Sequence, residues 1–173
     1  MALTLIKEDG TGKVDANAYA NAADGDAYHD GHLYASAWTA ATTANKEKSL
    51  VFATRLIDSQ CQFGGSKAIE TQALQWPRED CPDPDADGGS VEINIVPKGV
   101  IEATCETARE LLIADRTAAP PGEGLKYENT GTTQTGYDKS DTRPVISRVA
   151  QAMLAKFGVV IKSRSGAVRL VRS

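Results

Sequence analysis

Residues 97–112, PKGVIEATCETARELL, decide the fold class that the sequence predicts. Pro97 fits the first position of a helix, where its missing N–H is not needed for a hydrogen bond. After it, apolar and small side chains recur every three or four residues, which is typical of an amphipathic helix. We therefore predict a long helix here, and its buried stripe comprises Val100, Ile101, Thr104, Cys105, Ala108, Leu111 and Leu112.

Three other segments carry helix signals. Thr42 or Thr43 is a candidate N-cap for a helix that ends before Gly64-Gly65, with Leu50, Ala53, Leu56, Ile57 and Cys61 on one face. Pro144 predicts the start of another, whose stripe is Ile146, Val149, Ala150, Met153, Leu154 and Phe157. Asn21 predicts a short helix, weakened by its glycines. The fold class predicted is mainly α, a small bundle of three to four helices with an extended arm or β segment and a C-terminal hairpin or hook.

The chain reads as a single domain with extensions. Residues 1–116 form the predicted helical core, with an N-terminal strand and an irregular acidic loop at 79–95. Residues 117–142 are rich in Pro, Gly, Thr and Ser and show no core stripe, so we expect an extended arm that becomes ordered on a partner. Residues 143–173 comprise the C-terminal helix and a basic hook, in which Ser165-Gly166 predicts a hairpin turn.

Charge is unevenly distributed along the chain. Residues 142–173 hold seven Lys or Arg and no acidic residue, whereas residues 1–141 hold twelve basic and 23 acidic residues, a net charge of −11. A basic end on an acidic body is attracted to an acidic surface or to phosphates. This pattern favours a component of a larger assembly over a free enzyme.

The sequence offers no catalytic residue, no metal site and no cofactor site. His29 and His32 lie three residues apart among aspartates, but no third ligand appears at a motif spacing, so we expect solvated surface there. Asp83, Asp85, Asp87 and Gly88 match the opening of an EF-hand loop, but the twelfth position is Asn94 rather than Glu. The three cysteines are widely spaced, which favours free thiols that form neither a disulfide framework nor a zinc site. Neither a signal peptide nor a membrane span is predicted.

Aromatic residues supply the remaining candidates. Trp76 and Arg78 are predicted to anchor the start of the acidic loop on the bundle, and the alternative role for Trp76 is stacking a base or docking a partner. Tyr127 and Tyr137 in the arm are candidates for a subunit interface formed by strand addition.

The hook is the candidate partner-binding segment. Its basic residues alternate with apolar ones, as in a strand that lies on another protein's acidic surface. A merely solvated cationic end and a nucleic-acid tail are the alternatives. The predicted contact residues are Lys162, Arg164, Val168, Arg169, Leu170 and Arg172.

Three stretches together resemble a known family. Residues 2–29 (ALTLIKEDGTGKVDANAYANAADGDAYH), residues 72–80 (QALQWPRED) and residues 95–112 (IVPKGVIEATCETARELL) are similar to head–tail connector adaptors of tailed bacteriophages. Related phage sequences are often labelled DnaT-like single-stranded DNA-binding proteins. The ending SGAVRLVRS is also similar, whereas the acidic 79–89 loop and the 117–142 arm depart from the family pattern.

The resemblance implies a structural role without catalysis. Such adaptors form a homo-oligomeric ring, usually a dodecamer, beneath the portal protein, and their C-terminal segments engage that portal. A tail or stopper protein binds below, and double-stranded DNA passes through the lumen without specific recognition. The resemblance thus places the protein in the virion neck after synthesis in the host cytoplasm, away from membranes. The alternative function is single-stranded DNA binding.

Overall fold

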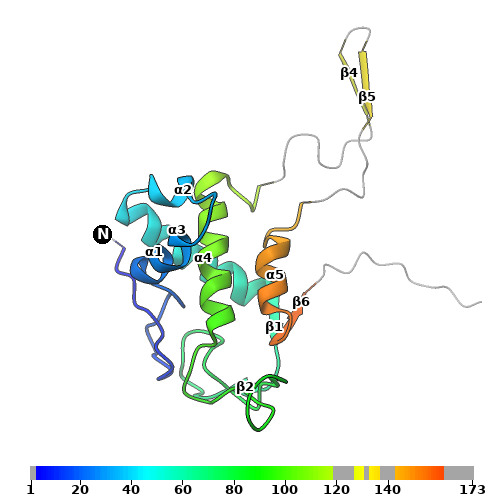
Figure 1. The fold of residues 1–173 in the computed structure, drawn as a ribbon. Coiled ribbons are helices and arrows are strands. Elements are labelled where there is room, and N and C mark those ends of the chain that lie inside the picture. The colour runs from blue at the N-terminus through cyan, green and yellow to red at the C-terminus, as the bar shows by residue number, and fades with distance from the viewer. Residues whose placement is uncertain (1–2, 119–126, 131–132, 137–142, 162–173) are drawn as a thin grey trace, which may run out of the picture.

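The computed structural model describes residues 3–118, 127–130, 133–136 and 143–161 (Figure 1). Within these ranges there are five helices and six strands. The helices are α1 (Ala22–Asp30), α2 (Ser36–Thr39), α3 (Thr43–Gln60), α4 (Lys98–Ile113) and α5 (Arg148–Leu154). The strands are β1 (Cys61–Phe63), β2 (Ser66–Lys67), β3 (Arg78–Glu79), β4 (Tyr127–Thr130), β5 (Thr133–Gly136) and β6 (Gly158–Val160).

The predicted fold class, a mainly-α bundle of three to four helices, is wrong. The described residues form a mixed α/β fold with five helices and three two-stranded antiparallel sheets, β1–β6, β2–β3 and β4–β5. All six of these strands have only two to four residues. Alternation over so few residues is too short to be detected in a sequence, and β1–β6 is a pairing of distant segments.

Helix α4 lies at the centre of the fold, with α3 and α5 packed against it (Figure 1). The larger core cluster joins Ile57 of α3, Val100 of α4 and Leu154 of α5 with Trp76 and Phe157, all of them buried. Gly99 permits the close approach of α4 to the end of α5, because a Cβ there would lie 3.0 Å from the Phe157 ring and 3.1 Å from the Met153 carbonyl. Alanine at this position would press on both groups.

The predicted helix starts after Asn21 and Thr42 are confirmed. Asn21 forms a capping box with Asp24, and the Thr42 hydroxyl accepts a hydrogen bond from the Asn45 N–H. The start of α5 differs from the prediction at Pro144. Ser147 is its N-cap and accepts from the Ala150 N–H at 3.2 Å, so the helix begins at Arg148. Proline permits a helix start, but here the hydroxyl cap determines it.

Candidate protein-docking site

The C-terminal face of the body is built by α5 and by a sheet between distant segments. Strand β6 pairs antiparallel with β1, so that Cys61 faces Val160 and Phe63 faces Gly158. Two further hydrogen bonds extend the ladder at its ends: Ile161 N donates to Gln60 O at 2.7 Å, and Gly64 N donates to Phe157 O at 2.9 Å. This pairing fixes the position of Ile161, the last residue described before the basic end of the chain.

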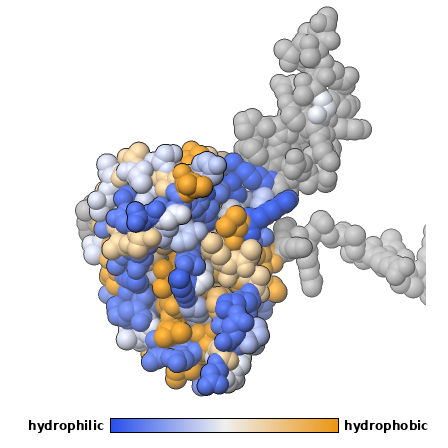
Figure 2. Space-filling view, in the orientation of Figure 1, coloured by the Kyte–Doolittle hydropathy of each residue, from blue (hydrophilic) through white to orange (hydrophobic). Residues whose placement is uncertain are grey.

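Apolar side chains are exposed around this sheet. Val149 of α5 is 53% exposed, Val159 is 65% exposed and Ile161 is 52% exposed. Between α5 and β6 lies a hollow of about 480 Å³, lined by Cys61, Arg148, Gln151, Ala152, Leu154, Ala155, Gly158, Val159 and Val160. The side of the body that carries α5 in Figure 1 accordingly includes hydrophobic surface in Figure 2. Exposed apolar surface beside a strand is typical of a protein contact.

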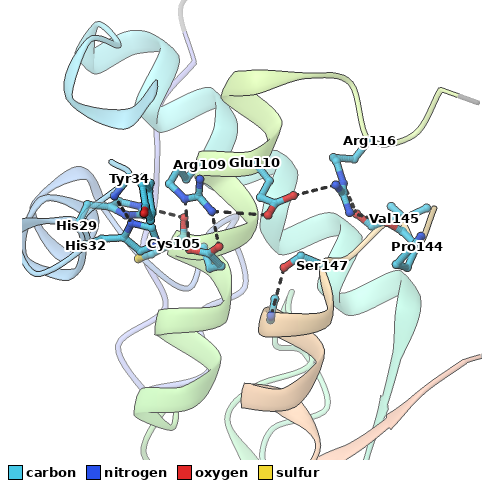
Figure 3. A network of polar contacts seen from close by, with 12 residues as sticks. His29, His32, Tyr34, Cys105, Arg109, Glu110, Arg116, Pro144, Val145 and Ser147 are labelled. Carbon is cyan, nitrogen blue, oxygen red and sulfur yellow. Dashed lines mark hydrogen bonds and ion pairs between the residues drawn. The ribbon is translucent and has the colours of Figure 1, made fainter. Parts of the chain in front are cut away.

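A chain of polar contacts holds the start of α5 against α4 (Figure 3). Arg116 pairs with Glu110 through Nη1 and Oε2 at 2.8 Å. Its guanidinium also donates to the Pro144 carbonyl at 2.7 Å and to the Val145 carbonyl at 3.3 Å. One arginine therefore binds both the C-terminal end of α4 and the segment that leads into α5. The candidate site is held at a fixed place on the core by these bonds.

The same polar chain continues along α4 to the α1–α2 region (Figure 3). Arg109 lies 3.6 Å from Glu110 and 2.5 Å from Glu106, whose side chain is only 3% exposed. His32 approaches Glu106 at 3.8 Å, and its Nδ1 accepts a hydrogen bond from the Tyr34 N–H. These contacts are structural in character, because each charged group is satisfied by a protein partner.

Trp76 and Arg78 lie inside the body. Trp76 is fully buried between the Phe63 and Phe157 rings, both edge-on to it with centroids 5.5 and 5.7 Å away. The Arg78 guanidinium donates to the carbonyls of Gly64 and Gly65 at 2.6 and 2.8 Å. Trp76 is thus placed as an internal anchor, and its ring is not available for stacking a base.

The other predicted contact residues lie at or beyond the limits of the described chain. Tyr127 is the first residue of β4, which pairs with β5, and Tyr137 lies outside the described residues. The six predicted hook residues also lie outside them: Lys162, Arg164, Val168, Arg169, Leu170 and Arg172.

His29 is buried, not solvated as expected. It is 2% exposed, packs beside Trp38 with ring centroids 4.9 Å apart, and its Nε2 lies 3.2 Å from the Cys105 carbonyl. Burial lowers the pKa of this imidazole. The His29 and His32 ring centroids lie 5.9 Å apart, and the two Nε2 atoms face different partners, the Cys105 carbonyl for His29 and the Glu106 carboxylate for His32.

The acidic loop is partly neutralised by the C-terminal region. Lys156 lies 3.3 Å from Asp83 and 3.2 Å from Asp85. In the described ranges, no group of three or more His, Cys, Asp or Glu residues is arranged to hold a metal ion. None of the helices described is both long and apolar enough to cross a membrane.

The three cysteines are buried, free thiols. Burial raises the pKa of Cys61 to about 11 and that of Cys105 to about 12, so both are thiols at neutral pH. A thiol of this kind is a weak nucleophile and a weak metal ligand. Cys61 therefore contributes an apolar wall to the hollow beside α5.

The β1–β6 pairing was not predicted from the sequence, and the hollow between α5 and β6 was therefore not predicted either. The β-branched run at 159–161 was visible as a strand signal, but nothing in the sequence pointed to Cys61–Phe63 as its partner. Val149 was assigned to the buried stripe of α5, yet it is exposed. Neighbouring residues of a helix differ by about 100° around its axis, so Val149 lies at the edge of the face that buries Ala150 and Leu154.

The chain is similar to known proteins at the level of a protein family. A family model with the description "Putative DnaT-like ssDNA binding protein" matches residues 3–173. Neither the curated proteins nor the solved structures include a match to this chain. Because the family match spans almost the whole sequence, the chain belongs to the DnaT-like ssDNA binding protein family.

Proposed function

We propose that the protein is a structural adaptor that docks on other protein subunits through its C-terminal face. The observation that carries this proposal is the exposed apolar surface of Val149, Val159 and Ile161 beside the hollow between α5 and β6. This surface leads directly into residues 162–173, where basic and apolar residues alternate. Apolar area supports affinity, and a basic rim supports the choice of an acidic partner.

The finer form of the proposal is the head–tail connector of a tailed bacteriophage. In this form the protein assembles as a ring, with the portal protein on one side and a tail or stopper protein on the other. The similarity of residues 2–29, 72–80 and 95–112 to such adaptors supports it. The acidic body also supports it, because a channel wall with net negative charge lets DNA pass without adhering.

The test is the mass of the complex formed with a portal ring from the same genome. We expect a discrete complex with one copy per portal subunit. Replacing Arg164, Arg169 and Arg172 by Gln should weaken it by about tenfold or more at low salt. The matched control replaces Lys48, Arg55 and Lys98, three exposed basic residues of the body, by Gln.

The two triple variants carry the same charge change. Equal affinity of both for the portal would remove the hook from the interface. Absence of any complex with the unaltered protein would contradict the connector proposal as a whole.

The second candidate function is single-stranded DNA binding, which the family description favours. In the described body both tryptophans are buried, Trp38 at 1% and Trp76 at 0% exposed, so base stacking there would depend on an exposed aromatic such as Tyr34. Phosphate contacts would come from the basic residues after Ile161. DNA binding of this kind predicts affinity for an oligo-dT strand that falls steeply with salt and is lost in the Arg164, Arg169 and Arg172 variant.

A further inference from the structure

A second hollow lies at the α1–α2 corner, across α4 from α5 in Figure 1. It has a volume of about 460 Å³ and is built by α1, α2 and the connection between them. The described residues that line it are Asp26, His29, Asp30, His32, Leu33, Ala35, Ser36, Trp38 and Thr39. Two of these are aspartates, and neither lysine nor arginine is among them. The lining therefore carries negative charge.

A buried ring nitrogen faces this hollow without a partner. His29 is 2% exposed, and its Nδ1 has no hydrogen-bond partner in the part of the chain that the structure describes. Nε2 lies 3.2 Å from the Cys105 carbonyl on α4 (Figure 3), so Nε2 carries the proton and Nδ1 keeps its lone pair. The two nitrogens of an imidazole point in divergent directions. Because Nε2 points at α4, Nδ1 points to the α1–α2 side, where His29 lines the hollow. A buried acceptor of this kind requires a donor.

The charged groups around the hollow are acceptors as well. Asp26 accepts from the Trp38 indole N–H at 2.8 Å and from Lys46 Nζ at 2.7 Å, both on Oδ1, and its side chain is still 58% exposed. Asp30, the last residue of α1, is exposed. An ionised carboxylate can only accept hydrogen bonds. A ligand that fits this site must therefore supply several donors and positive charge.

The rim of the hollow is apolar. Leu33 lines it and is 93% exposed, and the adjacent Tyr34 is 77% exposed. A ligand with an apolar stem and a cationic head matches both parts of the site. Arginine has such a stem, and its planar guanidinium presents several N–H donors in different directions, as acceptors on separate residues require. The ammonium of lysine is a compact point charge and fits this arrangement less well.

We propose that the hollow between α1 and α2 binds an arginine side chain of a partner protein. The guanidinium donates to His29 Nδ1 and to the carboxylates of Asp26 and Asp30, and the stem packs on Leu33. The proposal goes beyond the proposed function, because this site shares no residue with the C-terminal face and needs no portal protein.

The test is an NMR titration of the full chain with N-acetyl-arginine methylamide, which supplies the side chain alone. We expect a Kd on the order of 1 mM, as for a good ligand of this size. The Leu33 amide should shift, and the His29 Nδ1 resonance should move upfield, since its lone pair accepts a hydrogen bond. The blocked citrulline has nearly the same shape without the charge and should bind at least about tenfold more weakly.

A pair of matched variants tests the negative charge. Asp30→Asn should weaken the binding of the blocked arginine about fivefold. Asp15→Asn also neutralises an exposed aspartate, but one that does not line the hollow, and it should leave the Kd unchanged. Equal effects of the two substitutions would contradict the proposal.

A peptide distinguishes a partner protein from a free small molecule. A blocked Leu-Arg-Leu peptide should bind at least about tenfold more tightly than the blocked arginine, and Leu33→Ser should remove this gain. Equal affinity of peptide and blocked arginine would overturn the assignment to a partner protein. An unchanged His29 Nδ1 resonance would overturn the site, and equal binding of the blocked lysine would overturn the choice of arginine. Because the portal is absent from this titration, its outcome is independent of the proposed function.

Discussion

Glu8 and Glu106 are both buried carboxylates, 0% and 2% exposed, but the protein satisfies them in different ways. Glu8 accepts three main-chain hydrogen bonds from its own turn, from the N–H groups of Gly10, Gly12 and Lys13 at 2.8 to 2.9 Å. Glu106 is paired with the Arg109 side chain one turn further along α4, at 2.5 Å. The first carboxylate organises a loop, whereas the second belongs to a network of side chains.

This difference determines how strongly each of the two regions depends on a single side chain. The Glu8 turn has φ angles of +99° at Gly10 and +70° at Gly12, and a Cβ at Gly10 would lie 1.9 Å from the Asn94 carbonyl. Only glycine fits such a backbone against such a neighbour. The donors in this turn cannot be replaced by substitution, so the whole loop depends on one carboxylate. Around Glu106, in contrast, several side chains share the charge.

The largest effect is expected from Glu8→Ala. The substitution leaves the buried N–H groups of Gly10 and Gly12 without an acceptor, and the expected loss is about 4 kcal/mol of unfolding free energy. Urea unfolding measures it. Asp9→Asn removes an exposed carboxylate from the same turn and should change stability little. A small effect of both substitutions would refute the dependence of the loop on Glu8.

Asp58, a half-buried carboxylate, extends the comparison to the effect of pH on stability. It accepts hydrogen bonds from the Tyr19 hydroxyl and from Gln75 N, yet burial raises its pKa to about 6. A carboxyl whose folded pKa lies above its unfolded value stabilises the fold fully below about pH 4, and this contribution is lost as the pH rises through about 6.

The stability of the unaltered protein should therefore decrease between pH 4 and 6.5 by up to about 3 kcal/mol from this group. Asp58→Asn should flatten that part of the profile, as measured by unfolding at a series of pH values. The same slope in both proteins would assign the pH dependence to other groups.

The smallest effect is expected in the Glu106 network. Arg109→Met leaves Glu106 buried without its partner and should cost about 2 kcal/mol. Adding Glu106→Gln should recover part of that loss, because the unpaired charge is removed. A double-mutant cycle on thermal unfolding measures the coupling. Additive losses would mean that the two side chains do not act as a pair.

The helices were predictable to the extent that their signals are local. Asn21 and Thr42 lie where they cap α1 and α3, and the stripe on residues 97–112 faces the core as its period predicts. The start of α5 was misplaced because two local signals, Pro144 and Ser147, compete within four residues.

The candidate site was less predictable because it is made by distant contacts. Cys61–Phe63 follows α3 directly and has no strand signal of its own, so its pairing with β6 could not be inferred. The role of Arg116 was hidden for the same reason, since its carbonyl partners lie 28 and 29 residues further along the chain. His29 was taken as solvated because its aspartate neighbours are polar, whereas helix packing buries it against α4.

The β1–β6 pairing also affects the order in which the fold forms. Cys61 and Val160 are separated by 99 positions, so closing this sheet requires most of the chain to be present. Contacts between such distant positions form late, because the entropy of a long loop must be lost before they are made. The apolar surface around β6 is therefore expected to be among the last parts of the fold to form.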